Sequence, residues 1–307
     1  MTAADPRVFV IFNPASGRGR GAARMPRYLE LLERHVPGFQ HAVTGRAGDE
    51  AALVARALAG GARTIAAMGG DGTWSLVADH LLRAGRGDVS LALLPAGTGN
   101  DFGKSVGAVW ERAEAVVRAI GDGARRRIDV GRCDGRHFLN VVGLGFDIAV
   151  IDDALTLPVL RGDALYRFSA MRQLFRFPGV RLTIEDDEGG SVTRDHLMLI
   201  IANARFFGGT FRIAPRASLT DGRLDAVSIM NQGPFARMRA FRRVSAGTHE
   251  ALDTVTIRQS RRFRVAFAAP LRYELDGEVY AAASEALTIE SVPAALELVV
   301  PEDRGAR

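Results

Sequence analysis

The stretch TIAAMGGDGT, residues 64–73, runs from a strand-like apolar segment into a glycine-rich turn. A helical pattern follows it as far as Leu82. Two other apolar runs, Val8–Phe12 and Val89–Leu94, also lead into turns rich in glycine and polar residues. Strands that alternate with helices in this way indicate a parallel sheet with helices on both faces. The three turns are therefore expected at the carboxyl edge of that sheet, where ligands bind in open α/β folds.

The remaining pattern divides the chain into two domains. We predict a doubly wound α/β domain over residues 1–128 and a mostly antiparallel β-sandwich over residues 129–307. The last apolar run, at about 294–300, fits either half. In the first domain we expect a strand at 40–44, an N-cap at Asp49, and helices near 24–35, 49–58, 73–82 and 110–120. In the second we expect helices near 166–175 and 234–246 and strands at 128–130, 138–142, 180–185, 196–202, 223–230, 254–258, 263–267 and 287–290.

The composition is that of a globular protein, with 47% of the 307 residues hydrophobic and 24% charged. The net charge is +5, and Lys104 is the single lysine among 40 basic residues. This balance favours anionic partners such as phosphates, nucleic acid or an acidic membrane surface. The one cysteine, Cys133, excludes an internal disulfide and fits a reducing compartment. Because no run approaches the ~18 apolar residues of a membrane span, we expect a cytoplasmic protein that touches at most the inner face of the membrane.

The three turns have the features of a phosphate-binding site. Glycine lets backbone N–H groups approach a phosphate closely. Ser16, Thr73, Thr98 and Asn100 would add side-chain donors, and a helix beginning at Thr73 would add its positive end. Neither a complete Walker motif nor a dinucleotide-binding G-x-G-x-x-G follows a strand. Because the sequence contains no cluster of Cys and His, a metal at this site would be Mg²⁺ with oxygen ligands.

A series of motifs resembles the diacylglycerol kinase catalytic family, which includes sphingosine and ceramide kinases and soluble bacterial lipid kinases. In the first half these motifs are Asn-Pro-x-Ser-Gly at 13–17, Gly-Gly-Asp-Gly-Thr at 69–73 and Leu-Pro-Ala-Gly-Thr-Gly-Asn-Asp-Phe at 94–102. In the second half, residues 140–147, 203–225 and 276–278 are similar to later signatures of the family. The resemblance covers nearly the whole chain. It implies an ATP-dependent lipid kinase whose last strand returns to the first domain.

The resemblance also implies roles for individual residues. Asp71 would orient a Mg²⁺ ion on the β and γ phosphates of ATP, and Glu278 would take the proton from the acceptor hydroxyl. Asp221, with the backbone carbonyls of Ser218 and Arg223, would hold a second, structural Mg²⁺ ion. The residues expected at the nucleotide are Asn13, Ser16, Gly17, Thr44, Gly69, Gly70, Asp71, Gly72, Thr73, Trp74, Ser75, Thr98 and Asn100.

Two alternatives compete with the lipid kinase. An NAD kinase shares the Gly-Gly-Asp-Gly-Thr turn and the two-domain plan. The other alternative is a non-catalytic protein that binds nucleotides or anionic surfaces. It is supported by Leu76, which stands where the family usually has Glu, and by Ser75, which stands where the family has Asn. The arginine clusters at 237–243 and 258–264 fit solvated faces, or docking on anionic lipid headgroups. We expect no nucleic-acid partner, since no recognition helix or aromatic platform is recognisable. The acceptor lipid stays open, as does the oligomeric state, with a homodimer included.

Overall fold

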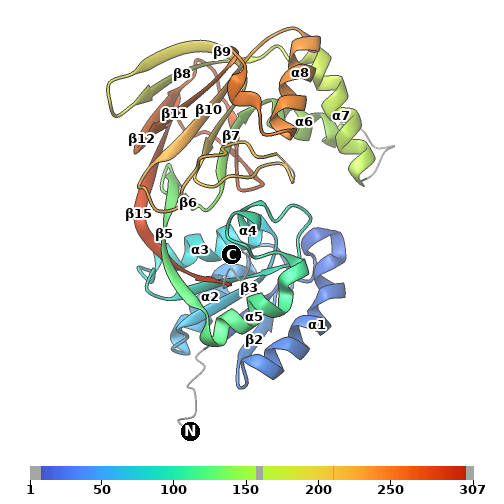
Figure 1. Ribbon diagram of the computed structural model, residues 1–307, viewed down its shortest axis with the longest axis vertical. Helices are drawn as coiled ribbons and strands as arrows, with labels where there is room; N and C mark the ends of the chain where they lie inside the picture. Colours follow the sequence, from blue (N-terminus) through green and yellow to red (C-terminus); the bar gives the residue numbers. More distant parts are fainter. Residues whose placement is uncertain (1–7, 157–161, 210, 302–307) are drawn as a thin grey trace.

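The computed structural model describes residues 8–156, 162–209 and 211–301. It consists of two halves, one above the other in Figure 1, that are joined along one side by two long strands. These strands are β5 (Ala124–Cys133) and β15 (Ala286–Val300), which pair antiparallel with each other. The combination of an α/β half and a β-rich half confirms the predicted fold class.

The first half is a parallel sheet in the order β2-β1-β3-β4, with β15 beside β4. Residues in β1, β3 and β4 are buried at every position, which explains why these strands are continuous apolar runs rather than alternating ones. The strands are β1 (Val8–Phe12), β2 (Gln40–Val43), β3 (Thr64–Gly69) and β4 (Ser90–Pro95). The helices are α1 (Arg20–His35), α2 (Asp49–Ala59), α3 (Asp71–Arg83), α4 (Asp101–Ser105) and α5 (Ala113–Asp122).

Several helix starts in the first half differ from the prediction. Helix α3 begins at Asp71, two residues before the expected Thr73. Helix α1 begins at Arg20, one turn earlier than expected. Asp49 is the first residue of α2 and not its N-cap, because Gly48 precedes it in the left-handed region with φ 91°. The Asp49 carboxylate instead accepts the backbone N–H groups of Gly45 (2.8 Å) and Arg46 (3.0 Å), and so closes the loop before the helix.

The second half is built mainly from antiparallel strands. One face of its sheet closes over an apolar core, and helices cover the other face (Figure 1). The strands after β5 are β6 (Arg136–Phe138), β7 (Val141–Gly145), β8 (Val180–Asp186), β9 (Ser191–Ala202), β10 (Leu224–Met230), β11 (Val255–Ser260), β12 (Arg262–Ala266), β13 (Arg272–Leu275) and β14 (Glu278–Ala281). The helices are α6 (Phe146–Leu155), α7 (Gly162–Arg176) and α8 (Pro234–Ser245).

Several elements of this half differ from the sequence prediction. Helix α6 and the strands β13 and β14 were not predicted. The expected strand at 138–142 is divided between β6 and β7. The runs at 287–290 and 294–300 belong to the single strand β15, whose register with β5 shifts between Val292 and Leu296. Within the described residues, no helix is long and apolar enough to cross a membrane.

Strand β15 spans both halves. It pairs with β12 in the upper half, with β5 along most of its length, and with β4 in parallel at Leu298 and Leu91. The shift in register is held by Asp129, a buried residue of β5 whose carboxylate accepts the N–H groups of Ala294 (2.7 Å) and Gly222 (2.6 Å). The predicted domain boundary, after residue 128, therefore falls inside a strand that both halves share.

Candidate functional site

The glycine turns after β1, β3 and β4 touch one another at the carboxyl edge of the sheet. A Cβ atom on Gly17 would lie 2.5 Å from the carbonyl oxygen of Ala96, and one on Gly97 would lie 2.5 Å from Cα of Gly70. Only glycine fits such close backbone approaches. The three turns thus form a continuous backbone surface.

A cavity of about 270 Å³ opens beside this surface, between the two halves. Asn13, Thr44, Gly72 and Thr73 line it from the first half, and Glu278 and Tyr280 line it from β14. The structure therefore brings together five of the predicted site residues from segments more than 200 residues apart. Glu50 and Leu76 also line the cavity. No motif singled out Glu50 or Tyr280.

Hydrogen bonds fix the polar residues on the first-half wall. The side-chain amide of Asn13 donates to Oγ1 of Thr73 at 3.0 Å, and Oδ1 of Asn13 accepts the N–H of Ala15 at 3.1 Å. The hydroxyl of Ser16 donates to the carbonyl of Asn13 at 2.8 Å. The N–H of Thr44 donates to the carbonyl of Phe12 at 2.8 Å, which places Thr44 just beyond the end of β2. A side chain on Gly69 would collide with Thr73.

Asp71 links the glycine turn to helix α4. Its two carboxylate oxygens accept the backbone N–H groups of Asp101 (3.0 Å) and Phe102 (2.9 Å) at the start of that helix. Burial raises the pKa of Asp71 to about 6, and the nearby charge of Asp101 adds to the rise. Two neighbouring carboxylates repel each other and would also repel a bound phosphate. A cation that lies between the carboxylates and the phosphates would offset both repulsions.

Trp74, one of the residues predicted at the nucleotide, points into the core of the first half. Its side chain is fully buried, its indole N–H donates to the carbonyl of Ala67 at 2.9 Å, and its backbone N–H donates to the carbonyl of Gly70 at 3.1 Å. Both donors are thus used inside the domain. The physical reason is the helical period, because Trp74 lies on the same face of α3 as the buried Val77 and Leu81.

Thr98 and Asn100 lie in the turn after β4 and differ in their environment. Thr98 is exposed to solvent. Asn100 is buried in the left-handed region with φ 51°, and its side chain accepts the N–H of Gly97 (3.1 Å) and donates to the carbonyl of the same residue (3.2 Å). Its side-chain amide thus closes the loop on itself.

Ser75 contacts the second half of the molecule. Its hydroxyl hydrogen-bonds the carboxylate of Asp276, which also accepts the N–H groups of Leu139 (2.6 Å), Asn140 (3.0 Å) and Val141 (2.8 Å). Asp276 is buried, and burial raises its pKa. These contacts hold the tight turn from which β14 begins.

Glu278 is the first residue of β14 and follows this turn directly. Asp276 and Gly277 both have positive φ, of 50° and 95°, so the turn is tight and points Glu278 at the glycine turn of the first half. A Cβ atom on Gly72 would lie 3.3 Å from Oε1 of Glu278. Solvent reaches the side chain, yet partial burial and the charge of Glu50 raise its pKa above the usual value of a glutamate.

The turn at 218–223 carries the other predicted metal ligands. Oδ1 of Asp221 accepts the N–H of Arg223 at 3.0 Å, and Oγ of Ser218 accepts the N–H of Thr220 at 3.4 Å. Asp221 is exposed. Burial raises the pKa of Asp225 to about 6, and the charge of Asp221 contributes to the rise.

The donor chemistry of both regions fits Mg²⁺ rather than a softer metal. Among the described residues, no group of three or more His, Cys, Asp or Glu side chains is arranged to hold a metal ion alone. Mg²⁺ commonly binds through one or two carboxylates together with substrate phosphates and water. Asp71 and Asp101 meet that requirement, because each of their oxygens accepts one hydrogen bond and keeps a second lone pair.

Comparisons with known proteins agree with this geometry. Residues 7–133 match the family described as diacylglycerol kinase catalytic domain, and residues 140–300 match the YegS C-terminal NAD kinase beta sandwich-like domain. The chain belongs to the diacylglycerol kinase catalytic family. It is similar to a probable YegS-like lipid kinase of Pseudomonas putida, with 35% identity over 84% of each chain. It is also similar to a diacylglycerol kinase of Mycobacterium tuberculosis, with 27% identity over 96% of this chain and 95% of the relative.

The fold agrees as well. The structure of a putative diacylglycerol kinase from Bacillus anthracis str. Sterne superposes with a TM-score of 0.78 at 21% identity, covering 96% of this chain and 97% of that one. As a member of the family, the protein is a phosphotransferase of the lipid kinase type. The resemblance seen in the sequence motifs is thereby confirmed.

The kinase has a second cavity, with a volume of about 510 Å³, in its second half. Its wall is largely apolar, and includes Phe146 of α6, Leu174 of α7, Phe241 of α8, and Phe207 and Phe211 of the loop after β9. A cavity of this kind suits a hydrocarbon chain, because each buried CH₂ group contributes about 0.8 kcal/mol.

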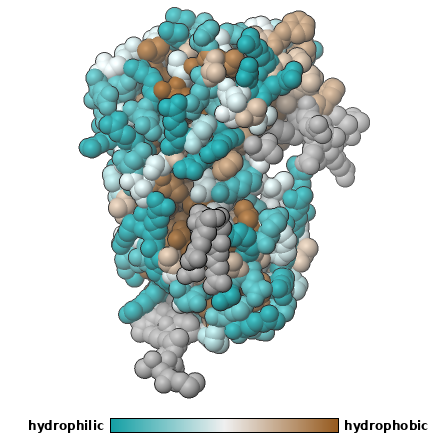
Figure 2. Space-filling model, viewed as in Figure 1, coloured by the Kyte–Doolittle hydropathy of each residue, from teal (hydrophilic) through white to brown (hydrophobic). Residues whose placement is uncertain are grey.

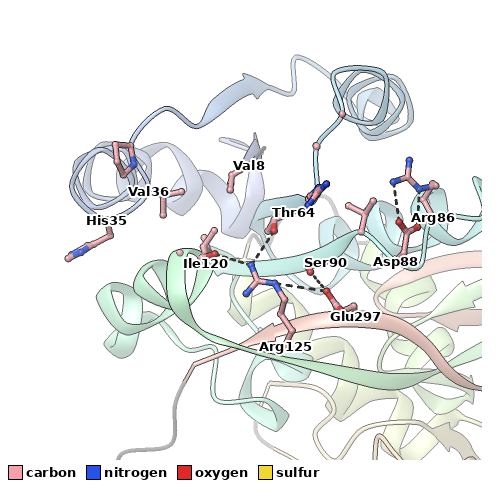
Figure 3. Close-up of a pocket in the computed structure, with 16 residues that line it drawn as sticks. Val8, His35, Val36, Thr64, Arg86, Asp88, Ser90, Ile120, Arg125 and Glu297 are labelled. Atoms are coloured by element: carbon pink, nitrogen blue, oxygen red, sulfur yellow. Dashed lines mark hydrogen bonds and ion pairs between the residues drawn. The ribbon is translucent and has the colours of Figure 1, made fainter. Parts of the chain in front are cut away.

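The kinase also has a larger cavity, of about 690 Å³, at the opposite edge of the first-half sheet. Figure 3 shows that its charged side chains turn toward one another: Arg86 pairs with Asp88 at 2.9 Å, and Arg125 with Glu297 at 4.0 Å. None of the predicted site residues lines it. In open α/β folds ligands bind at the carboxyl edge of the sheet, which is where the smaller cavity at Glu278 lies.

Proposed function

We propose that the protein transfers the γ-phosphoryl group of ATP to the hydroxyl of diacylglycerol or a related lipid alcohol, with Mg²⁺ and with Glu278 as general base. The observation that carries the proposal is the position of Glu278. It projects from the second half onto Gly72 in the glycine turn of the first half. A carboxylate at this position lies beside the glycine turns, which would bind the phosphates. It also lies at the boundary with the second half, which contains the apolar cavity.

The nucleotide would lie on the glycine surface. The backbone N–H groups at Gly69–Thr73 and the start of α3 suit its phosphates. Asn13 and Thr44 line the same cavity and supply polar contacts. Ser16 and Gly17 belong to the same turn as Asn13, and the hydroxyl of Ser16 donates to the carbonyl of Asn13. Trp74, Ser75 and Asn100 support this surface from within. Mg²⁺ bound at Asp71, with Asp101 nearby, would neutralise charge on the phosphates.

Glu278 would act on the acceptor. The lipid hydroxyl oxygen forms a bond to the γ-phosphorus as the bond to the ADP oxygen breaks, and Glu278 takes the hydroxyl proton. Its raised pKa makes it a better base than a glutamate with the usual pKa. Asp276 supports it through three backbone hydrogen bonds that fix the turn.

The apolar tail of the acceptor would occupy the cavity between α6, α7 and α8. The turn at Ser218, Asp221 and Arg223 remains our prediction for a structural Mg²⁺ site. Asp129 and Gly222 connect that turn to β5, and an ion there would stabilise the junction of the two halves.

Exposed apolar side chains lie on two of the helices that line the apolar cavity. Phe168, Met171 and Phe175 follow one face of α7, and Phe235 and Met238 lie on α8. Met171 and Met238 also line the cavity. Figure 2 shows apolar atoms at the upper right, where Figure 1 places α7 and α8. We name these five residues the α7–α8 face.

Arginines border this face. Arg239 and Arg242 are exposed on α8, and Arg242 lines the cavity. Arg237 belonged to the same predicted cluster, but it is buried and donates to the carbonyls of Leu174 and Phe177. In the other cluster, Arg258 and Arg264 are paired with acidic residues. Apolar side chains bordered by positive charge suit an anionic lipid bilayer, and we propose that this face docks on one.

Reversing the charge of Arg239 and Arg242 together, as Arg239→Glu/Arg242→Glu, is expected to weaken binding to anionic vesicles at least about tenfold. Each basic residue near such a surface contributes on the order of 1 kcal/mol. Phe235→Ser, made alone, should also weaken binding to the vesicles, because the Phe235 side chain is 81% exposed and would be buried in the bilayer. Vesicle sedimentation at low salt measures both effects. Val43→Ser, at an exposed apolar residue of β2, is the control, and equal losses in all three variants would contradict the docking face.

The proposed reaction can be tested with labelled ATP. The purified protein is offered diacylglycerol, phosphatidylglycerol, a sphingoid base and an isoprenoid alcohol in mixed micelles, with NAD as a soluble acceptor. We expect label in a lipid, and none with the Asp71→Ala variant. Transfer to NAD alone would identify the NAD kinase alternative. Absence of transfer to every acceptor would favour the non-catalytic protein.

A further inference from the structure

Helix α4 lies between the two proposed binding sites and contacts both. On its nucleotide side, its first N–H groups donate to the carboxylate of Asp71. On its other side, it reaches the loop that follows β9. The N–H of Arg205 donates to Oγ of Ser105 at 3.2 Å, and the N–H of Gly209 donates to Oδ2 of Asp101 at 2.8 Å.

Lys104 completes the contact with Gly209. Its ammonium group pairs with Oδ1 of Asp101 at 2.8 Å and donates to the carbonyl oxygen of Gly209. The amide N–H and the carbonyl of Gly209 are therefore held by the two members of one ion pair. The pair is largely buried, since the side chains of Asp101 and Lys104 are 9% and 29% exposed. Hydrogen bonds to charged groups contribute more than neutral ones.

Gly209 in turn lies beside the wall of the apolar cavity, next to the lining residue Gly208. Phe207 and Phe211, on either side of it, exchange backbone hydrogen bonds of 2.8 and 3.0 Å. Both aromatic residues and Gly208 line the cavity. Gly208 and Gly209 have positive φ, of 63° and 85°, so the loop bends sharply here and presents the peptide of Gly209 to α4.

We propose that the Asp101–Lys104 ion pair is a coupling element: it positions Phe207, Gly208 and Phe211 in the wall of the acceptor cavity in response to nucleotide binding at Asp71. Lys104 is then a positioning residue that contacts neither substrate. The inference rests on the proposed function. The coupling must also be reciprocal. If bound nucleotide raises the affinity of the cavity for the lipid, bound lipid must raise the affinity for the nucleotide by the same factor.

Arg83 provides a matched control elsewhere in the same interface. It pairs with Asp79 on its own helix at 2.7 Å and donates to the carbonyl of Gly135 across the boundary at 2.8 Å. The chemistry is that of Lys104, a cation bound to a helical carboxylate and to a glycine carbonyl of the other half. Neither Arg83 nor Gly135 lines the apolar cavity.

The first test follows backbone amide hydrogen exchange in residues 205–209, with and without Mg²⁺ and a non-hydrolysable ATP analogue. We expect the analogue to slow exchange of the Gly209 amide in the wild type. In Lys104→Met, exchange should be faster and insensitive to the analogue, and Lys104→Arg should restore the response. If the analogue binds but leaves residues 205–209 unchanged, the coupling is overturned and the proposed function stands. If the analogue does not bind at all, both are overturned.

The second test separates the kinetic constants in the lipid assay. Loss of a charged hydrogen bond to the loop that carries the cavity wall should raise the apparent KM for the lipid at saturating ATP about tenfold in Lys104→Met, while the affinity for ATP measured without lipid changes less than twofold. Arg83→Met should leave the lipid KM at the wild-type value. An equal effect of the two substitutions would assign Lys104 a purely structural role and contradict the proposal.

Discussion

Asp71→Ala is expected to abolish phosphoryl transfer, with kcat at least about 10³-fold below the wild type, while the protein stays folded. Removal of the carboxylate takes away the proposed Mg²⁺ ligand at the phosphates. It also removes the two hydrogen bonds that anchor α4. Steady-state transfer of labelled phosphate measures the loss. An Asp71→Ala variant with wild-type turnover would contradict the assignment of the site.

The pH dependence of unfolding separates this loss of activity from a loss of structure. The folded-state pKa of Asp71, at about 6, lies above its usual value, so the stability it contributes at low pH is lost as the pH rises through 6. At pH 8 the buried charge costs about 3 kcal/mol in the absence of a cation. Asp71→Asn, which removes the charge but also one acceptor oxygen, should therefore compare more favourably with the wild type at pH 8 than at pH 5. Urea unfolding at pH 5 and pH 8 without Mg²⁺ checks this.

Glu278→Gln is expected to lower kcat by roughly 10²–10⁴ and to leave nucleotide affinity nearly unchanged. Glutamine keeps the shape of the side chain over Gly72 but cannot accept the proton. Single-turnover transfer and equilibrium nucleotide binding measure the two quantities. Turnover at the wild-type rate would make Glu278 only a turn residue, and Asp71 or Asp101 would become the next candidate for the base.

Glu50 offers a matched control for Glu278. A base must be deprotonated, so kcat should fall as the pH drops through the pKa of Glu278, which partial burial and the charge of Glu50 raise. Glu50→Gln removes that charge and should move the acidic limb of the pH profile to lower pH. Glu278→Gln should abolish the limb. A limb that is identical in all three proteins would assign it to another group.

The sequence predicted the features that depend on local pattern. The glycine turns at 13–17, 69–73 and 97–101 were placed because strand, turn and helix signals lie within ten residues of each other. The partners of Asp71 and Asp276 were not predicted, because each carboxylate accepts N–H groups from segments about 30 and 135 residues away. The contact of Lys104 with Gly209 depends on the same kind of distant approach.

Errors in the secondary-structure prediction also come from contacts between segments that are distant in the sequence. Helix α6 is apolar on several sides because it lies between the sheet and α7, so its period is weak. The runs at 287–290 and 294–300 were predicted as separate segments, yet Asp129 holds a shift in register between them, and β15 continues through it. Arg237 looked like part of a solvated face, but the carbonyls at the end of α7 bury it.

The long strand β15 has a consequence for the order in which the chain acquires its structure during synthesis. The strands β1 to β4 emerge from the ribosome first, yet the neighbour that covers the edge of β4 is formed by residues 286–300. Until those residues have been translated, β4 presents unpaired N–H and C=O groups. The nascent first half therefore keeps an unpaired strand edge until nearly the entire chain has been translated. During that interval the edge can pair with strands of other nascent chains.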